Sequence, residues 1–195
     1  MPRDALILTH GAGGNRESPL LLAVSSAFEQ AGYLVERLNL PFRERRPKGP
    51  PRPSEAAGDR EGLRLAVRAM RQRVCGKVLL GGQSYGGRQA SILAAEEAGL
   101  ADGLLLLSYP LHPPGKPERP RADHFPQLTA PALFVLGARD PFGSPEELER
   151  ARKLLRSRNA VIVIEKAGHD LRKGAGWDQS QLVSFFGEDR PGGSG

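Results

Sequence analysis

Short apolar runs alternate with longer amphipathic segments from one end of the 195-residue chain to the other. Six of these runs have the length of strands and are rich in aliphatic residues: residues 5–9, 34–38, 77–81, 103–108, 132–136 and 160–164. All but the second are almost continuously apolar, which is typical of strands buried on both faces of a parallel sheet. The alternation therefore predicts an α/β fold with about six mostly parallel strands flanked by helices.

The segments between the runs supply the helices. Apolar residues recur at helical spacing in residues 20–31, 63–74, 145–156 and 179–186. Ser144 is a predicted N-cap, followed by a proline at the first helical position. Two long connections, residues 41–53 and 110–131, hold five and seven prolines, and neither is expected to form a helix. Because long loops in a compact domain are often functional, we expect both at the rim of a site.

Composition restricts the class of protein. With 39% hydrophobic residues the chain can fill one core, and with 26% charged residues it has no apolar run near the roughly 18 residues that cross a bilayer. The N-terminal apolar stretch is too short for a signal peptide, and the single Cys75 allows neither an internal disulfide nor a cysteine-based zinc site. We expect a cytoplasmic protein without a membrane segment, with one domain over residues 1–187 and a flexible tail at 188–195. Its oligomeric state is not predicted.

The net charge of +6 raises nucleic acid as a partner. Arg64, Arg68 and Arg71, however, lie at helical spacing opposite an apolar stripe, as on a solvated helix face. No zinc-finger spacing and no aromatic-rich RNA-binding pattern accompanies the charge. We therefore do not expect nucleic acid as the partner.

Residues 82–86 read Gly-Gln-Ser-Tyr-Gly and connect a predicted strand to a predicted helix. This G-x-S-x-G pattern makes a sharp turn in which the flanking glycines supply the space that a Cβ would block. Ser84 would stand at a helix N-terminus, where the backbone N–H of Tyr85 can stabilise an oxyanion. A glycine-rich phosphate-binding turn can have the same composition, so the residues elsewhere in the chain decide between the two.

A serine nucleophile needs a general base and an acid that orients the base. Asp140 follows the predicted strand 132–136, and His169 follows the strand 160–164. Since the carboxyl ends of parallel strands meet at one edge of the sheet, we predict Ser84, Asp140 and His169 as a catalytic triad. Their order along the chain is that of the G-x-S-x-G hydrolases.

Other acids fit this role less well. Asp102 precedes its strand and belongs at the opposite edge of the sheet, whereas Asp170 adjoins the histidine in sequence. Glu165 lies only four residues before His169 and follows the same strand. Asp140 therefore remains the predicted acid, although a turn-forming aspartate before Pro141 would have the same sequence.

The loop after the first strand is the expected source of a second oxyanion donor. Its residues 10–14 read His-Gly-Ala-Gly-Gly, and we predict the N–H of Ala12 as the donor, with that of Gly13 as the second choice. His10, directly before a glycine, is interpreted as a residue that braces the loop. His112 follows the end of a strand and is a candidate substrate contact, although an ordinary loop histidine is an equal alternative.

The histidines of the chain do not predict a metal site, whereas the basic residues near the predicted site indicate a type of substrate. No histidine has metal-ligand spacing with another ligand, so we expect no metal and no cofactor, and His124 has no predicted role. Arg88 is a candidate substrate-binding residue. Together with the loop residues Arg43, Arg45, Arg46 and Lys116 it lies near the predicted site, which favours an anionic acyl substrate.

These motifs together resemble the α/β-hydrolase superfamily over nearly the whole chain. Residues 10–14, 81–88, 109–117 and 137–143 are similar to a small branch that includes bacterial relatives of a testis-expressed hydrolase-like protein and of a histone-acetyltransferase NSL-complex subunit, and more distantly to dienelactone hydrolases. The resemblance implies a minimal α/β-hydrolase fold without the first two antiparallel strands and without a cap domain. It implies Ser84 as nucleophile, His169 as base and Asp140 as acid. It supplies no substrate, because the dienelactone hydrolases use cysteine where this chain has Ser84.

Two functions follow as hypotheses. The first is a serine hydrolase that acts on a small-molecule acyl ester or thioester through an acyl-enzyme. The second is a noncatalytic binding module whose basic loops, such as residues 43–48, engage an acidic partner. A pure scaffold needs none of the three triad residues, so the sequence favours the hydrolase.

Overall fold

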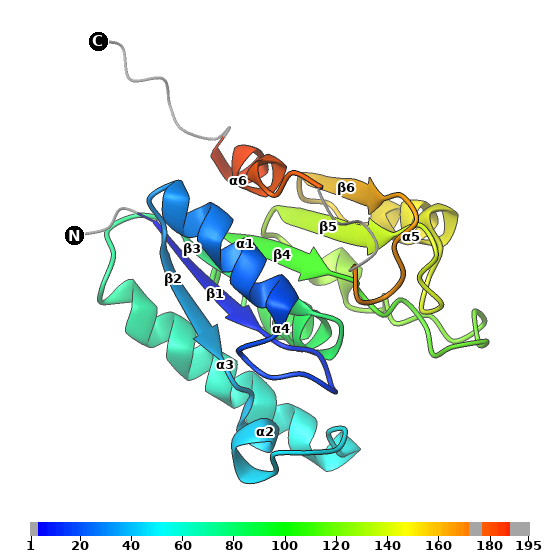
Figure 1. Ribbon diagram of the computed structural model, residues 1–195, viewed down its shortest axis with the longest axis horizontal. Coiled ribbons are helices and arrows are strands. Elements are labelled where there is room, and N and C mark those ends of the chain that lie inside the picture. The colour runs from blue at the N-terminus through cyan, green and yellow to red at the C-terminus, as the bar shows by residue number, and fades with distance from the viewer. Residues whose placement is uncertain (1–3, 172–176, 188–195) are drawn as a thin grey trace.

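The computed structural model describes residues 4–171 and 177–187. Its centre is a six-stranded, fully parallel sheet with the order β2-β1-β3-β4-β5-β6 (Figure 1). The strands are β1 (Ala5–Thr9), β2 (Leu34–Leu38), β3 (Val78–Gln83), β4 (Gly103–Leu107), β5 (Ala132–Gly137) and β6 (Asn159–Ile164). This sheet confirms the predicted α/β fold class, with each strand found within two residues of its expected bounds.

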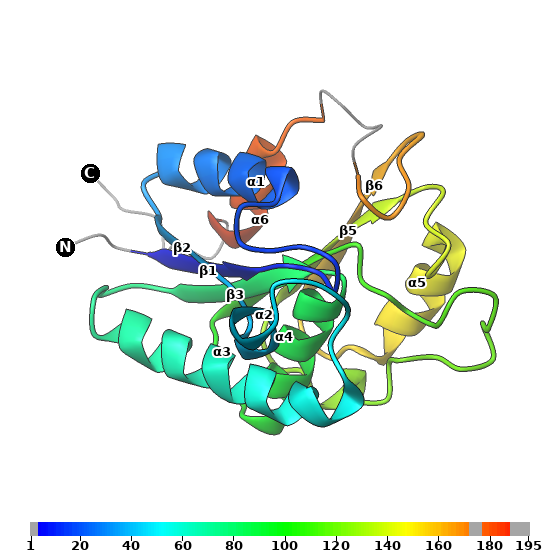
Figure 2. The ribbon, with the colours of Figure 1, turned by 60° about the horizontal axis from the view of Figure 1, so that its bottom comes forward.

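Helices cover both faces of the sheet, as Figure 2 shows. The α-helices are α1 (Pro19–Gln30), α2 (Pro41–Arg45), α3 (Ala56–Arg71), α4 (Tyr85–Glu96), α5 (Pro145–Ala151) and α6 (Ser180–Gly187). Three short 3-10 helices complete the set: η1 (Pro53–Glu55), η2 (Phe125–Gln127) and η3 (Arg152–Leu154). Helices α1 and α6 pack on one face, and α3 and α4 pack on the other.

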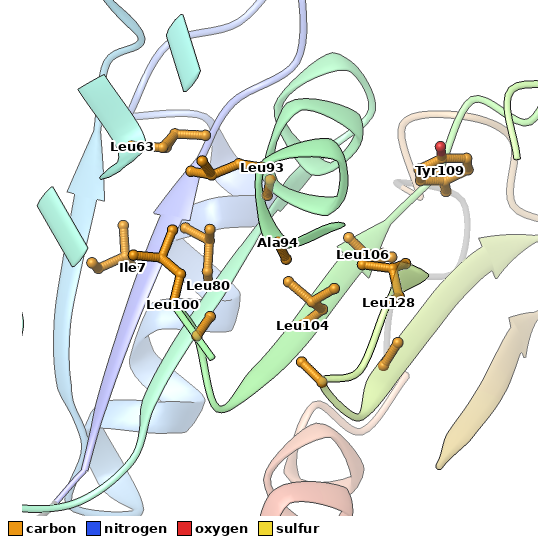
Figure 3. Close-up of a cluster of buried hydrophobic side chains, with 14 of the residues drawn as sticks. Ile7, Leu63, Leu80, Leu93, Ala94, Leu100, Leu104, Leu106, Tyr109 and Leu128 are labelled. Carbon is orange, nitrogen blue, oxygen red and sulfur yellow. The ribbon is translucent and has the colours of Figure 1, made fainter. Parts of the chain in front are cut away.

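Strand β1 shows why the chain buries two layers of apolar side chains. Leu6 and Leu8 belong to the cluster under α1 and α6, whereas Ala5 and Ile7 belong to the cluster under α3 and α4. Successive side chains of a strand point to opposite faces, so a continuously apolar strand serves both clusters. Figure 3 shows the second cluster, in which Leu63 from α3 and Leu93 from α4 approach the sheet.

The proline-rich segments depart in part from the prediction. The expectation that residues 41–53 contain no helix was wrong, because Pro41 begins α2 and Pro53 begins η1. Proline lacks an N–H and has a fixed φ, and at the first helical position neither property disturbs the helix. The segment 110–131 contains η2, which includes Pro126.

Between β4 and β5 the described chain contains η2 and no separate cap domain. No helix within residues 4–171 and 177–187 has the length and the apolar character needed to cross a membrane. The predicted tail at 188–195 lies outside the described residues.

Candidate active site

Ser84 occupies the turn between β3 and α4 with a φ of 50° and a ψ of −116°. A residue with a side chain adopts such a backbone only under constraint, at a cost of about 1–3 kcal/mol. The flanking glycines make the turn feasible: a Cβ on Gly86 would lie 2.5 Å from the carbonyl oxygen of His10, and one on Gly82 would lie 2.8 Å from the nitrogen of Gly87. The Ser84 N–H donates to the carbonyl of Leu107 at 2.8 Å, which ties the turn to the end of β4.

The structure brings Ser84, His169 and Asp140 into one hydrogen-bonded row. Oγ of Ser84 lies 2.8 Å from Nε2 of His169, and Nδ1 of His169 lies 2.8 Å and 3.0 Å from the two carboxylate oxygens of Asp140. An ionised carboxylate only accepts, so Nδ1 carries the proton and Nε2 accepts from the serine hydroxyl. The row therefore has the proton arrangement that general-base activation of a serine requires.

The acid of this row is held firmly. The side chain of Asp140 is fully buried, and its carboxylate also accepts the N–H of Phe142 at 2.9 Å. The ring of Phe142 packs on His169 with 4.2 Å between centroids. This contact restricts the imidazole from one side, while Asp140 fixes the tautomer. The sequence analysis did not identify Phe142, and a single aromatic residue in a loop offers no pattern that would have revealed it.

The loop after β1 is braced by the buried His10, as predicted. Its Nε2 accepts the N–H of Leu40 at 3.1 Å, which leaves Nδ1–H to donate to the carbonyl of Gly11 at 2.7 Å. Burial lowers the pKa of His10, so the neutral form that these two bonds require is favoured. The N–H groups of Ala12 and Gly13 donate to no acceptor within the described chain. They are free to face an oxyanion.

Arg43 holds the same loop through its guanidinium group. The arginine is buried on α2, and its Nε donates to the carbonyl of Gly14 at 2.9 Å while Nη2 donates to that of Ala12 at 2.7 Å. Further bonds reach the carbonyls of Arg46 and Gly49. Since these carbonyls point toward Arg43, the guanidinium fixes the conformation of the loop that carries the predicted oxyanion donors.

A second brace joins α3 to the nucleophile turn. Asp59 is fully buried and accepts the hydroxyl of Tyr85 at 2.8 Å and the N–H of Phe42 at 2.9 Å. Burial, followed by this carboxylate, raises the pKa of Tyr85, which keeps the phenol protonated as a donor. Asp59 was missed by the sequence analysis. Its position one helical turn before Leu63, on the apolar stripe of α3, is a signal that could have identified it.

A cavity of about 770 Å³ opens above Ser84 and His169. Its wall is formed by the glycine loop after β1, by prolines and by three arginines. The lining residues are Gly11, Ala12, Gly13, Gly14, Ser18, Pro19, Leu20, Pro50, Pro51, Arg52, Pro53, Ala56, Gln83, Ser84, Tyr85, Arg88, Gln89, Pro110, Arg121, Phe142, His169 and Asp170. Both proline-rich segments contribute to this wall, so they border the cavity as expected for the rim of a site.

Three of the predicted accessory residues, Tyr85, Ala12 and Gly13, line this cavity together with the predicted substrate contact Arg88. The structure does not bring His112 to it. The buried ring of His112 uses Nδ1 on the carbonyl of Pro113 at 2.7 Å and Nε2 on a carboxylate oxygen of Glu147 at 3.3 Å. Both ring nitrogens are therefore occupied within the chain, and the earlier assignment of His112 to the substrate is not kept.

Within the described part of the chain, no group of three or more histidine, cysteine, aspartate or glutamate side chains could hold a metal ion. Cys75 is exposed.

A family model described as an alpha/beta hydrolase domain matches residues 2–184. The chain belongs to this family. The match spans the whole parallel sheet, from β1 to β6. The narrower resemblance to testis-expressed and NSL-complex relatives stays a prediction.

Solved structures share the fold of this α/β hydrolase. An alpha-beta serine hydrolase homologue from Coxiella burnetii superposes with a TM-score of 0.71 at 17% identity, covering 95% of this chain and 85% of the other. A dienelactone hydrolase from Anabaena variabilis gives 0.68 at 20% identity, with the same two coverages. Est1E from Butyrivibrio proteoclasticus, solved with ferulic acid bound, gives 0.76 at 16% identity and covers 96% and 90%. At these identities the likeness establishes a common fold.

Proposed function

We propose that this α/β hydrolase is a serine hydrolase that cleaves a small acyl ester or thioester through an acyl-enzyme. The observation that carries the proposal is the 2.8 Å contact between Oγ of Ser84 and Nε2 of His169, with Nδ1 of the same ring on the buried carboxylate of Asp140. Family membership supports the same class of reaction. A single cysteine in the chain is consistent with a cytoplasmic enzyme.

In the first half-reaction Oγ of Ser84 attacks the acyl carbonyl while its proton passes to Nε2 of His169. Asp140 stays ionised and stabilises the imidazolium. The carbonyl oxygen becomes an oxyanion, for which the N–H groups of Tyr85 and Ala12 are the proposed donors. Collapse breaks the bond to the leaving group, which takes the proton from His169.

In the second half-reaction a water molecule replaces the leaving group. His169 removes its proton, the resulting hydroxide attacks the acyl-enzyme, and Ser84 recovers its proton when the carboxylic acid departs. The rigid parts of the site reduce the reorganisation that each step needs. Arg43 and His10 hold the donor loop, and Phe142 with Asp140 holds the imidazole.

The alternative of a binding module with free basic loops receives little support from residues 43–48. Arg43 is buried and donates to backbone carbonyls, and Arg46 forms an ion pair with Glu55 at 2.7 Å. Arg45 lies 3.8 Å from the same carboxylate. Most of the positive charge of this run is thus engaged within the chain rather than offered to an acidic partner.

A fluorophosphonate probe tests the proposal directly, because it phosphonylates only an activated serine. We expect mass spectrometry to find the label on Ser84 in the wild type and no label in Ser84→Ala, while the exposed Ser26→Ala keeps the label. We also expect His169→Ala and Asp140→Asn to lower kcat on 4-nitrophenyl acetate by about 10³–10⁴-fold. An unlabelled wild type that turns over none of a series of acyl esters from two to eight carbons would overturn the proposal.

A further inference from the structure

Two arginines from distant parts of the chain share the wall of the cavity above Ser84. Arg88 lies on α4, and its N–H donates to the carbonyl of Ser84 at 2.9 Å, so it is one helical turn from the nucleophile. Arg121 belongs to the connection between β4 and β5. The four residues from Ser84 to Arg88 correspond to a rise of about 6 Å along the helix axis. Both residues therefore line the cavity in which a substrate of the proposed hydrolase reacts.

Neither arginine has an anionic partner within the described chain. Nε of Arg88 is shielded from solvent and has no hydrogen-bond acceptor. Neither residue takes part in a salt bridge among residues 4–171 and 177–187. The neighbouring Arg60 of α3 behaves differently, because it binds Glu96 at 3.2 Å and the buried Gln89 at 3.0 Å. A half-buried guanidinium without an acceptor is costly, and an anionic ligand would remove that cost.

The position of Arg121 is fixed by backbone contacts. Its N–H donates to the carbonyl of Leu111 at 2.7 Å, and its carbonyl accepts the hydroxyl of the buried Tyr109 at 2.7 Å. Burial, followed by the positive charge of Arg88, lowers the pKa of Arg121. The fold thus holds the positive charges of Arg88 and Arg121 near each other, with no salt bridge to either among the described residues.

The charged side chains on the cavity wall are mostly positive. Its lining contains Arg52, Arg88 and Arg121 but only one acidic residue, Asp170. His124, which lies near Arg88, adds no further positive charge at neutral pH, because burial and the charge of Arg88 lower its pKa to about 4. The wall therefore offers a surplus of positive charge close to the nucleophile.

We infer that Arg88 and Arg121 form an oxyanion-binding subsite that selects acyl esters or thioesters carrying a second, negatively charged group, a carboxylate or a phosphate. The planar guanidinium binds either group through paired N–H donors. The inference rests on the proposed function for the position of the reacting carbonyl at Ser84. The backbone of Arg88 lies four residues, about 6 Å, along the helix from that of Ser84, so we choose adipate, whose two carboxyl carbons are five bonds apart, as the probe.

The first experiment compares two esters of equal length in steady-state kinetics. We expect the wild type to have a kcat/KM at least tenfold higher for 4-nitrophenyl hydrogen adipate than for its neutral methyl ester. Arg88→Gln and Arg121→Gln each reduce this ratio about tenfold, and the exposed Arg119→Gln, from the same connection as Arg121, retains it. A wild-type ratio near one, or a ratio unchanged in both cavity variants, overturns the inference even if both esters are hydrolysed.

The second experiment separates the subsite from the chemistry. Isothermal titration calorimetry on Ser84→Ala measures binding of adipate, of inorganic phosphate and of neutral dimethyl adipate. We expect one of the two anions to bind at least tenfold more tightly than dimethyl adipate, and the tighter one identifies the group. In the double variant Ser84→Ala/Arg121→Gln we expect the anion to bind no more tightly than dimethyl adipate. This variant also tests the subsite if Arg88→Gln fails to fold. If the wild type hydrolyses no ester but the anion binds, the proposed function fails and the subsite stands. If neither anion binds, the subsite fails.

Discussion

The two proline-rich segments that border the cavity have similar compositions but different structures. Residues 41–53 form α2 and η1, and two of their arginines are engaged within the chain, Arg43 on backbone carbonyls and Arg46 on Glu55, whereas Arg52 lines the cavity. Residues 110–131 contain only η2 and leave Arg121 without an anionic partner among the described residues. Both segments border the cavity, yet Arg43 of the first braces the loop after β1, whereas Arg121 of the second lines the cavity. The available acceptors, and not the arginines themselves, make this difference.

The largest effect is expected when the brace is removed. Arg43→Met keeps most of the side-chain volume but leaves the carbonyls of Ala12 and Gly14 without their charged donor. Because bonds to charged groups each contribute about 1.5–3 kcal/mol, we expect the free energy of unfolding to fall by about 3–4 kcal/mol in urea denaturation. Arg45→Met is the control, since that exposed side chain has only a 3.8 Å ion pair and should change stability by less than about 0.5 kcal/mol. Equal losses in the two variants would remove the proposed distinction between them.

His124, in the segment 110–131, should make the stability of the protein depend on pH. Ser91 donates its hydroxyl proton to the carbonyl of Arg88 at 3.0 Å, so Nε2–H of His124 donates to Ser91 Oγ at 2.8 Å. Burial, then the charge of Arg88, lowers the pKa of His124 from 6.5 to about 4. Between these pH values the unfolded chain binds more protons, so stability falls as the pH falls through this window.

At pH 5 this histidine should cost about 2 kcal/mol relative to pH 8. Denaturant titrations at both pH values, in the wild type and in His124→Gln, isolate the contribution. His10 has a lowered pKa as well and retains its own share of the slope in both proteins. A slope that His124→Gln leaves unaltered would contradict the assignment.

The smallest effect on stability is expected at Arg121. Its side chain has no ion pair within the described chain and lies near the like charge of Arg88, so Arg121→Gln should change the free energy of unfolding by less than about 0.5 kcal/mol. Measured beside Arg43→Met in the same urea series, this variant tests the contrast between the two segments. A loss of 2 kcal/mol or more would mean that Arg121 is a structural brace like Arg43.

Much of the fold could be predicted because its signals are local. The apolar runs predicted all six strands, and the proline after Ser144 predicted the start of α5. The errors were local as well. Strand β3 continues to Gln83, two residues beyond its expected end, because Gln83 still pairs with Leu107 in β4 although glycines precede it. The short helix α2 was missed because prolines were counted without regard to their position in a helix.

The site, too, has a part that could be predicted from the sequence and a part that could not. The sequence by itself determined that Ser84, Asp140 and His169 follow the carboxyl ends of parallel strands, because continuously apolar strands that alternate with helices indicate a parallel sheet. Only the tertiary structure decided which polar groups meet across long separations in the chain. It placed Arg43 against the carbonyl of Ala12, Asp59 against Tyr85, and Arg121 near Arg88, with no salt bridge to either arginine among the described residues. Periodicity specifies which side chains are buried, but a hydrogen bond also needs a partner at about 3 Å, and only the packed chain determines that partner.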